Sequence, residues 1–341
     1  MNWQIIGHQN IIKFLENCIF SGRLSHAFLF YGQKQIGKKE VAKQFAKALL
    51  CYEGRRVGLK NKKDQLNIPC NSCENCIEFD KKTHADFYWL EKGKQDKNIT
   101  VEQIRELRMS LASRSFFKSY KVAIISGAEF MSLSAANALL KTLEEPKGKT
   151  VIILIADKTE TIPKTILSRT QKIKFLPVAK KDIYDYLLKV KELDRARALE
   201  LSSISAGRPG RALLFAQYPE FWQRYILTVN NFFKLLSSKR HEKINFVANL
   251  FEDNKKLVVQ VNTVLPLLNL WQLLLRDILL LKLSLSDKII NSRVTGELEK
   301  LEPFFNLNKI KFLNSRIEET KILLNQNTNP KLVLENLLLD F

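Results

Sequence analysis

Acidic residues are in short supply in this sequence. Its 341 residues include 35 aspartates and glutamates against 55 lysines and arginines, which gives a formal net charge of +20. Such an excess suits a polyanionic partner such as DNA, and a lysine-rich surface facing solvent explains it equally well. Apolar residues make up 45% of the chain, which is enough for a full core and excludes a wholly disordered protein. The length predicts two or three domains.

Long hydrophobic runs without charge are also missing. The most apolar stretch, residues 267–283, contains Gln272, Arg276 and Asp277, which favours a core helix over a membrane span. Polar residues such as Asn2 interrupt the N-terminal segment, so we expect no secretory signal peptide. Internal repeats and low-complexity segments are absent from the sequence. We therefore expect a cytoplasmic protein whose five cysteines are reduced thiols or metal ligands rather than disulfides.

A stretch from Gly32 to Lys39, with the sequence GQKQIGKK, has the spacing of a phosphate-binding loop. It follows an apolar run typical of a buried strand and precedes a helical pattern. Gly32 and Gly37 would let backbone N–H groups converge on a phosphate, and Lys38 would reach the β- and γ-phosphates. The last position of the motif should be Ser or Thr, whose hydroxyl binds Mg²⁺, but here it is Lys39. Because an ammonium group repels a divalent cation, the loop is expected to hold no metal.

Two carboxylates that should follow the next buried strand are missing as well. In a phosphate-loop ATPase, one of them holds Mg²⁺ and the other polarises the attacking water. The strand predicted over residues 121–126 ends at Ser126, and Gly127 follows it. Glu129 lies two residues further on, where we expect a surface residue or a helix cap. The hydroxyl ligand, the metal-binding carboxylate and the base are all missing. A site that lacks all three groups is not expected to hydrolyse ATP.

Four of the cysteines have the spacing of a metal site. Cys70, Cys73 and Cys76 are three residues apart, and Cys51 precedes them. Four thiolates at short spacings predict a closed, tetrahedral structural zinc site. The alternative is an iron–sulfur cluster, which usually needs a further Cys-Pro pair downstream that is absent here. His84 is expected to lie beside the ligands or at the surface. The linker after Cys51 is basic and carries Arg55, Arg56, Lys60, Lys62 and Lys63.

Strands and helices are predicted to alternate over the first half of the chain, which indicates an α/β fold with a largely parallel sheet. The predicted strands cover residues 27–31, 86–91, 121–126, 151–156 and 172–175, and the predicted helices cover residues 5–20, 40–50, 100–111 and 134–145. From Pro177 onward the pattern is helical throughout. A long helix is expected over residues 255–283, with an interruption at Pro266.

These features together resemble the clamp-loader subunits of bacterial DNA polymerase III. The resemblance rests on residues 7–9 (GHQ), 24–30 (LSHAFLF), the four cysteines, 137–146 (NALLKTLEEP) and 167–169 (LSR). It implies an AAA+ core over residues 1–176, a parallel sheet flanked by helices with a zinc module inserted at about residues 51–76. It further implies a small helical lid over residues 177–217 and an all-helical collar over residues 218–341 that holds a five-subunit ring.

Within this family the γ/τ subunits hydrolyse ATP, whereas the similar δ′ subunit does not. The residues at Lys39, Ser126 and Gly127 favour the δ′ branch. That branch implies a stator that completes the loader ring, helps load the sliding clamp on primed DNA and, as a degenerate ATPase, is no enzyme by itself. The DNA polymerase activity of the holoenzyme resides in another subunit. The implied partners are the γ/τ and δ subunits, the sliding clamp and primer–template DNA, without a membrane. The implied cofactor is structural Zn²⁺. Mg²⁺ is not expected, and nucleotide binding stays open because Gly37 and Lys38 are retained.

The sequence Ser168-Arg169-Thr170 stands where the family has Ser-Arg-Cys. The resemblance implies that Arg169 enters the nucleotide site of a neighbouring γ/τ subunit as an arginine finger. Such fingers accelerate related GTPases roughly 10³- to 10⁵-fold. The alternative is a surface arginine paired with a local carboxylate. Arg211 stands at the place of a lid arginine that senses nucleotide, and here we expect it to be vestigial or structural.

Two other functions fit the residues. The first is an active ATPase of the clamp-loader type, in which Lys38 suffices and a carboxylate reaches the site from elsewhere in the chain. The second is a nucleic-acid-binding protein whose zinc knuckle and basic linker contact DNA.

Overall fold

The structure is a computed structural model of the chain. It describes residues 3–52, 68–93, 96, 98–117, 120–251, 257–326 and 328–341. Two compact units make up the chain, the first formed by residues 1–186 with 207–211 and the second by residues 187–206 with 212–341. The three-part division expected at residues 176 and 217 stays a prediction. The basic linker from Arg55 to Lys63 lies outside the described residues.

The first unit contains a five-stranded sheet in the order β2-β3-β4-β1-β5. Its strands are β1 (Ala27–Tyr31), β2 (Phe87–Glu91), β3 (Lys121–Ser126), β4 (Thr150–Ala156) and β5 (Gln171–Lys174). All neighbouring strands are parallel, so the predicted parallel α/β core is confirmed. The carboxyl ends of β1, β3 and β4 consequently meet at one edge of the sheet, where ligands bind in folds of this kind.

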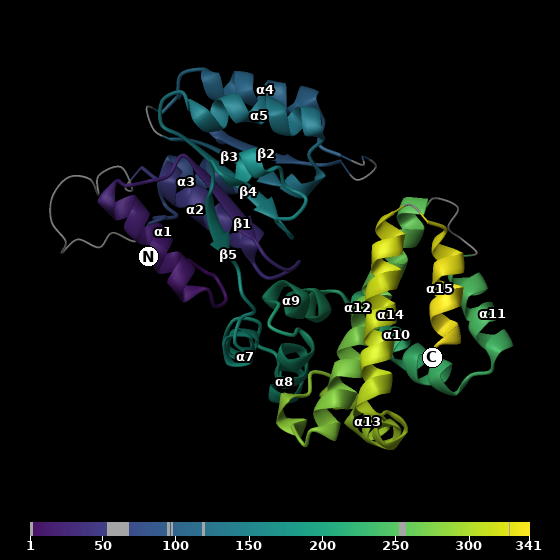
Figure 1. The fold of residues 1–341 in the computed structure, drawn as a ribbon. Coiled ribbons are helices and arrows are strands. Elements are labelled where there is room, and N and C mark those ends of the chain that lie inside the picture. The colour runs from purple at the N-terminus through teal and green to yellow at the C-terminus, as the bar shows by residue number, and fades with distance from the viewer. Residues whose placement is uncertain are drawn as a thin grey trace. The chain divides into compact units, whose positions relative to one another are not determined.

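Helices cover both faces of the sheet (Figure 1). One face packs against α1 (Gln9–Ser21), α2 (Lys38–Leu50) and α3 (Glu74–Asp80), and the other against α4 (Val101–Ala112) and α5 (Leu133–Glu144). Strand residues alternate between the two layers. Phe28 and Phe30 join the core beneath α2, while Leu29 between them joins the core beneath α4 and α5. Burial on both faces explains why the strands are continuous apolar runs in the sequence.

Local sequence signals fix several helix boundaries. A capping box stands at the start of α4, with the Thr100 side chain accepting from the Gln103 N–H and the Gln103 side chain accepting from the Thr100 N–H. The helix predicted from residue 5 begins only at Gln9. Gly7 and His8 have φ angles of 71° and 58°, which a right-handed helix cannot contain.

The second unit is helical throughout, as the pattern after Pro177 predicts. The chain passes between the units within α7 (Lys180–Lys189) and α9 (Pro209–Gln217). The other helices of the second unit are α8 (Arg195–Ile204), α10 (Pro219–Ser237), α11 (Arg240–Phe251), α12 (Leu257–Lys282), α13 (Thr295–Leu301), α14 (Leu307–Asn325) and α15 (Pro330–Leu339).

Helix α12 is the core of the second unit. The interruption expected at Pro266 is wrong, since α12 runs through this residue. Val264 and Leu268 are buried on either side of it, and this packing supports a single helix across the proline. By length and composition Thr263–Lys282 could cross a membrane, but half of its most apolar window is buried within the structure. Trp271 is fully buried at its centre, which is how a core helix packs.

Candidate functional site

The phosphate-loop motif lies between β1 and α2, at the carboxyl edge of the sheet. It turns through left-handed backbone angles at Gly32 (φ 147°), Gln35 (φ 63°) and Gly37 (φ 111°). A Cβ atom on Gly32 would lie 2.5 Å from the carbonyl oxygen of Phe175. Only glycine fits there, so the first glycine of the motif serves the close approach of the loop to the chain that follows β5.

Two donors from outside the loop hold its backbone in place. His8 Nε2 lies 2.8 Å from the carbonyl oxygen of Ile36, so this nitrogen carries the proton and donates it. The N–H of Gly210 donates to the carbonyl oxygen of Gln35 at 2.9 Å. Burial lowers the pKa of His8, although its bond to Ile36 acts in the opposite direction. Segments far apart in the sequence therefore clamp the loop.

Lys38 points into the loop rather than out of it. Its buried ammonium donates to the carbonyl oxygen of Gly32, to that of Gln33 at 2.8 Å and to Asp157 Oδ1 at 3.0 Å. A lysine ammonium has three N–H donors, and all three are engaged here. Lys34 Nζ lies 3.7 Å from the other oxygen of the same carboxylate, Asp157 Oδ2. Burial lowers the pKa of Lys38, against the attraction of Asp157.

Glu129 is neither the surface residue nor the helix cap that the sequence predicted. It lies in a short 3₁₀ helix, η2 (Ala128–Phe130), and is half-buried. Its Oε1 accepts from the N–H of Asp157 at 3.1 Å, while its buried Oε2 has no hydrogen-bond partner among the described residues. Burial raises the pKa of this carboxyl group. Glu129 and Asp157 thus form a pair of carboxyl groups beside Lys38, which reasoning from the positions after β3 alone did not reveal.

Lys39 turns away from the loop carbonyls. Its Nζ forms an ion pair of 2.9 Å with Oε2 of Glu91, the last residue of β2, and lies 5.7 Å from the centre of the Trp89 ring. The hydrogen bond from Lys39 is the main reason why the pKa of Glu91 is lowered. Glu91 pairs in register with Ser126, which ends β3 and is buried, and Gly127 follows with a φ of 79°. A phosphate-loop ATPase has its metal-binding acid at this edge of the sheet. This chain instead has the ion pair of Lys39 and Glu91 there.

Arg169 follows α6 (Lys164–Leu167) and is held locally. Its Nη2 lies 2.6 Å from Glu144 Oε1 at the end of α5, and its Nη1 donates to the carbonyl oxygen of Thr165 at 3.0 Å. Nη1 also donates to Oγ of the exposed Ser168 at 3.2 Å. The Thr170 side chain is buried and donates to the carbonyl oxygen of Ile166 at 3.1 Å. The exposed guanidinium is thus paired with a local carboxylate in this chain.

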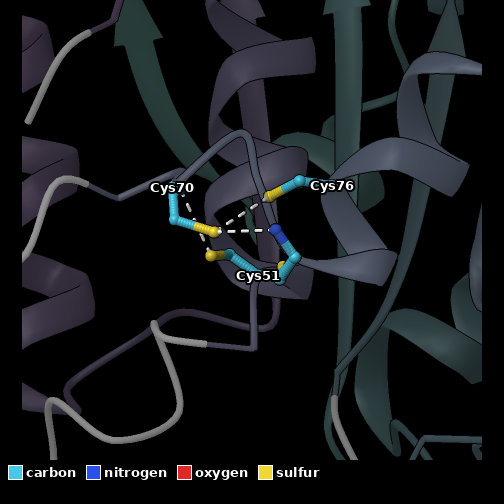
Figure 2. A group of neighbouring side chains, drawn as sticks. Cys51, Cys70 and Cys76 are labelled. Carbon is cyan, nitrogen blue, oxygen red and sulfur yellow. Dashed lines mark hydrogen bonds between the residues drawn. The ribbon is translucent and has the colours of Figure 1, made fainter.

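The four predicted cysteines come together in space. The Sγ atoms of Cys51, Cys70, Cys73 and Cys76 all lie within 4.8 Å of one another. Figure 2 shows Cys51, Cys70 and Cys76 converging, and the Sγ atoms of Cys70 and Cys76 are 3.9 Å apart. Four sulfurs at about 2.3 Å from a tetrahedral zinc are about 3.8 Å from one another. The N–H groups of Cys70 and Cys73 donate to the sulfurs of Cys51 and Cys70 at 3.4 and 3.3 Å.

This donor set fits zinc and leaves no position open for a substrate. Without a cation, the hydrogen bond with Cys51 and burial raise the pKa of the Cys76 thiol far above its usual range. A bound cation would reverse this effect and hold all four groups as thiolates. His84 is buried, which rules out the surface position among its two expected places. Its Nδ1 accepts from the N–H of Asp86 at 3.1 Å.

Comparison with known proteins identifies the family. A family model described as "DNA polymerase III, delta subunit" matches residues 7–179, just over half of the chain. The chain belongs to this clamp-loader family. DNA polymerase III subunit delta′ of Bacillus subtilis is 36% identical over 178 residues, which are 52% of this chain and 50% of the relative. DNA polymerase III subunit delta′ of Pseudomonas aeruginosa is 35% identical over 187 residues, 54% of each chain.

Members of the clamp-loader family named as gamma also match. DNA polymerase III subunit gamma of Buchnera aphidicola subsp. Schizaphis graminum is 28% identical over 283 residues, 81% of this chain and 74% of the relative. The chain spans about half the length of the delta′ relatives. Among solved structures, a DNA polymerase III gamma subunit-related protein from Thermotoga maritima has a TM-score of 0.40 and 19% identity, covering 95% of this chain and 97% of that one.

Proposed function

We propose that this chain is a non-hydrolysing, δ′-type subunit of the DNA polymerase III clamp loader. In this role it is a stator that completes the loader ring, supplies Arg169 to the nucleotide site of a neighbouring γ/τ ATPase and helps load the sliding clamp on primed DNA. The observation that carries the proposal is the state of the phosphate loop. All three donors of Lys38 are engaged by the chain itself, and Lys39 is paired with Glu91 where a metal ligand would stand.

The arrangement of charges supports the loss of hydrolysis. Hydrolysis of ATP needs a divalent cation that bridges the β- and γ-phosphates and a base that orients the attacking water. Lys39 offers no oxygen ligand and adds a positive charge instead. Ser126 and Gly127 offer neither of the two acids. By this proposal the chain is no enzyme by itself, and Mg²⁺ is not part of its site.

The environment of Arg169 suits a residue that changes partner. Its side chain is 36% exposed and that of Glu144 is 47% exposed, so solvent screens the pair. Exposed ion pairs contribute about 0–1 kcal/mol, which a triphosphate at a subunit interface could readily outweigh. A guanidinium forms charge-assisted, bidentate bonds with phosphate oxygens. Thr170 donates inward to the helix, so it does not compete for the same ligand.

The proposal extends to partners and domains. The γ/τ and δ subunits, the sliding clamp and primer–template DNA are its partners, and the net charge of +20 suits the DNA among them. The three parts are an AAA+ core (residues 1–176), a lid (177–217) and a collar (218–341), in a cytoplasmic protein. Zn²⁺ held by the four cysteines stabilises the module at about residues 51–76 and takes no part in chemistry.

The test is ATP turnover by the loader reassembled from this chain and its γ/τ and δ subunits, stimulated by clamp and primed DNA. We expect Arg169→Ala to lower turnover severalfold while the complex still assembles, as judged by size-exclusion chromatography. Arg23→Ala, which also removes one arginine from an exposed position, is the matched control and should leave turnover unchanged. Unchanged turnover in Arg169→Ala would show that Arg169 is structural and that the stator supplies no finger.

A second candidate is an active ATPase, which one observation favours. Glu129 and Asp157 bring two carboxyl groups next to Lys38 from positions outside the usual motif. If these groups served a metal, the isolated chain would hydrolyse ATP in the presence of Mg²⁺. Turnover would then be lost in Lys38→Ala and kept in Arg169→Ala. We expect no such turnover.

A further inference from the structure

We propose that Asp157 serves as an internal anion that occupies the phosphate position of the loop and, with Glu129 behind it, keeps nucleotides out. The inference rests on the proposed function, in which the loop does no hydrolysis, and it adds that the loop does not bind nucleotide either. It assigns a role to two acidic residues that lie outside the recognisable motif.

The first argument is the position of the Asp157 carboxylate. It lies between two lysines of the loop, with Oδ1 at 3.0 Å from Lys38 Nζ and Oδ2 at 3.7 Å from Lys34 Nζ. A phosphate group bound in such a loop needs the lysine ammonium and an uncompensated positive field. Here the anion is built into the chain directly after β4. An incoming phosphate would have to displace a carboxylate that is tethered in place.

The second argument is the position of Glu129, which holds the backbone of Asp157 and adds a second acidic group to the site. Glu129 Oε1 accepts from the N–H of Asp157 at 3.1 Å and so holds the backbone that carries the carboxylate. Its Oε2 is buried and has no hydrogen-bond partner among the described residues. A second acidic group beside Lys38 repels an anionic ligand, because like charges brought together at a site disfavour binding.

The third argument is that groups of the chain itself hold the loop in its shape. Gln35 and Ile36 accept hydrogen bonds from Gly210 and His8, and Lys38 donates to the carbonyl oxygens at the start of the loop. An incoming phosphate would therefore compete with contacts that the chain itself makes.

The test is binding of ATP and ADP to the full chain, measured by isothermal titration calorimetry with Mg²⁺ and again with EDTA. We expect little or no binding by the wild-type chain and a gain of about tenfold or more in affinity for Asp157→Asn, since the amide keeps the shape and removes the charge. The gain should be independent of Mg²⁺ and should disappear when Lys38→Ala is added. Glu129→Gln provides a second, independent variant and should shift affinity in the same direction.

Asp80→Asn is the matched control. Asp80 pairs with Lys47 at 2.8 Å, and the Lys47 side chain is as buried as that of Lys38, at 6% exposure each. This variant loses the same charge away from the loop and should bind like the wild-type chain. Circular dichroism melts establish that each variant is folded before titration.

The outcomes separate this inference from the proposed function. Affinity in both Asp157→Asn and Glu129→Gln that stays within twofold of the wild-type value, or falls below it, overturns the internal anion. A fall that occurs only with Mg²⁺ would identify the two acids as metal ligands. A different result would overturn the proposed function, namely ATP hydrolysis by the wild-type chain alone.

Discussion

Lys39 Nζ and Glu91 Oε2 form an ion pair of 2.9 Å at the carboxyl end of β2. This pair joins the first turn of α2 to a strand that lies beyond β3 in the sheet order. Phosphate-loop enzymes place a hydroxyl at this position of the loop and direct it to a metal. In this chain the same position serves as a structural contact between a helix and the sheet edge.

We predict that Lys39→Thr raises the pKa of Glu91 towards its ordinary value of 4.5. The hydrogen bond from Lys39 is the main cause of the lowered value in the folded chain. A carboxyl group with a lowered folded-state pKa contributes stability that is present above its unfolded value and is lost as the pH falls through the folded one. Carbon-13 NMR titration of the Glu91 carboxyl group measures the shift.

Lys43→Thr is the control for this titration. Lys43 lies over the same Trp89 ring at 5.3 Å but is only a minor contributor to the pKa of Glu91. The change in pKa should be clearly smaller in Lys43→Thr than in Lys39→Thr. Equal shifts in the two variants would mean that general charge, and not the direct bond, sets the pKa of Glu91.

We predict that His8→Ala lowers the free energy of unfolding of the first unit by about 1–3 kcal/mol. The substitution leaves the carbonyl oxygen of Ile36 without its donor and removes an edge contact with the Phe175 ring, whose centre lies 4.9 Å from that of His8. Urea unfolding measures the loss. His241→Ala, at an exposed position of α11, is the control and should change stability little.

The same histidine predicts a pH dependence. Burial lowers the pKa of His8 from 6.5 in the folded chain, so the folded state favours the neutral ring. Its contribution to stability is complete above pH 6.5 and is lost as the pH falls from that value through the folded pKa, because only the unfolded chain takes up the proton there. The stability of wild type and His8→Ala should therefore converge as the pH is lowered from 7 to 5. A constant difference across this range would contradict the assignment.

We predict that Gly210→Ala disturbs the phosphate loop. A Cβ atom on Gly210 would lie 2.8 Å from the carbonyl oxygen of Gln35, so the loop or the start of α9 must shift. Overpacking of this kind costs about 1–3 kcal/mol. Gly296→Ala is the control, because its Cβ would meet open space within α13 and should stabilise by about 0.5–1 kcal/mol. Thermal unfolding of the two variants should shift in opposite directions.

The sequence predicts the fold of the first unit well because its signals are local. Buried parallel strands are continuous apolar runs, and the capping box at Thr100 and Gln103 marks a helix start without reference to the rest of the chain. The cysteine spacing works in the same way, since the short intervals between Cys70, Cys73 and Cys76 already fix three donors of one site. Such features need no knowledge of distant contacts.

The contacts that define the candidate site are different in kind. Asp157 and Lys38 are far apart in the sequence and meet only because β4 lies next to β1 in the sheet. The sequence predicted Glu129 at the surface or as a helix cap. Its distance along the chain from Ser126 does not reveal that Asp157, which follows the neighbouring strand β4, lies beside it. The position of Asp157 directly after a buried strand was the available signal. The sequence could not predict the partner of Arg169 either, because Glu144 lies at the end of another helix, α5.

The cysteine cluster leads to the last prediction, which concerns metal content and stability. We expect the purified chain to hold one zinc ion for each molecule, measured by inductively coupled plasma mass spectrometry. Cys76→Ser should lose it, because it removes one of four ligands from a closed site. Structural zinc contributes on the order of 10 kcal/mol to small modules, so strong chelators should lower the melting temperature of the wild-type chain.

Cys18→Ala is the matched control for this loss. Cys18 is a buried residue of α1 outside the cluster, so its variant should keep the zinc even though it loses some packing. The absorption spectrum separates zinc from the alternative that the sequence left open. An iron–sulfur cluster absorbs in the visible range, whereas zinc thiolates do not. Visible absorbance that disappears in Cys76→Ser and persists in Cys18→Ala would overturn zinc in favour of iron, while a colourless, zinc-containing chain is the result we expect.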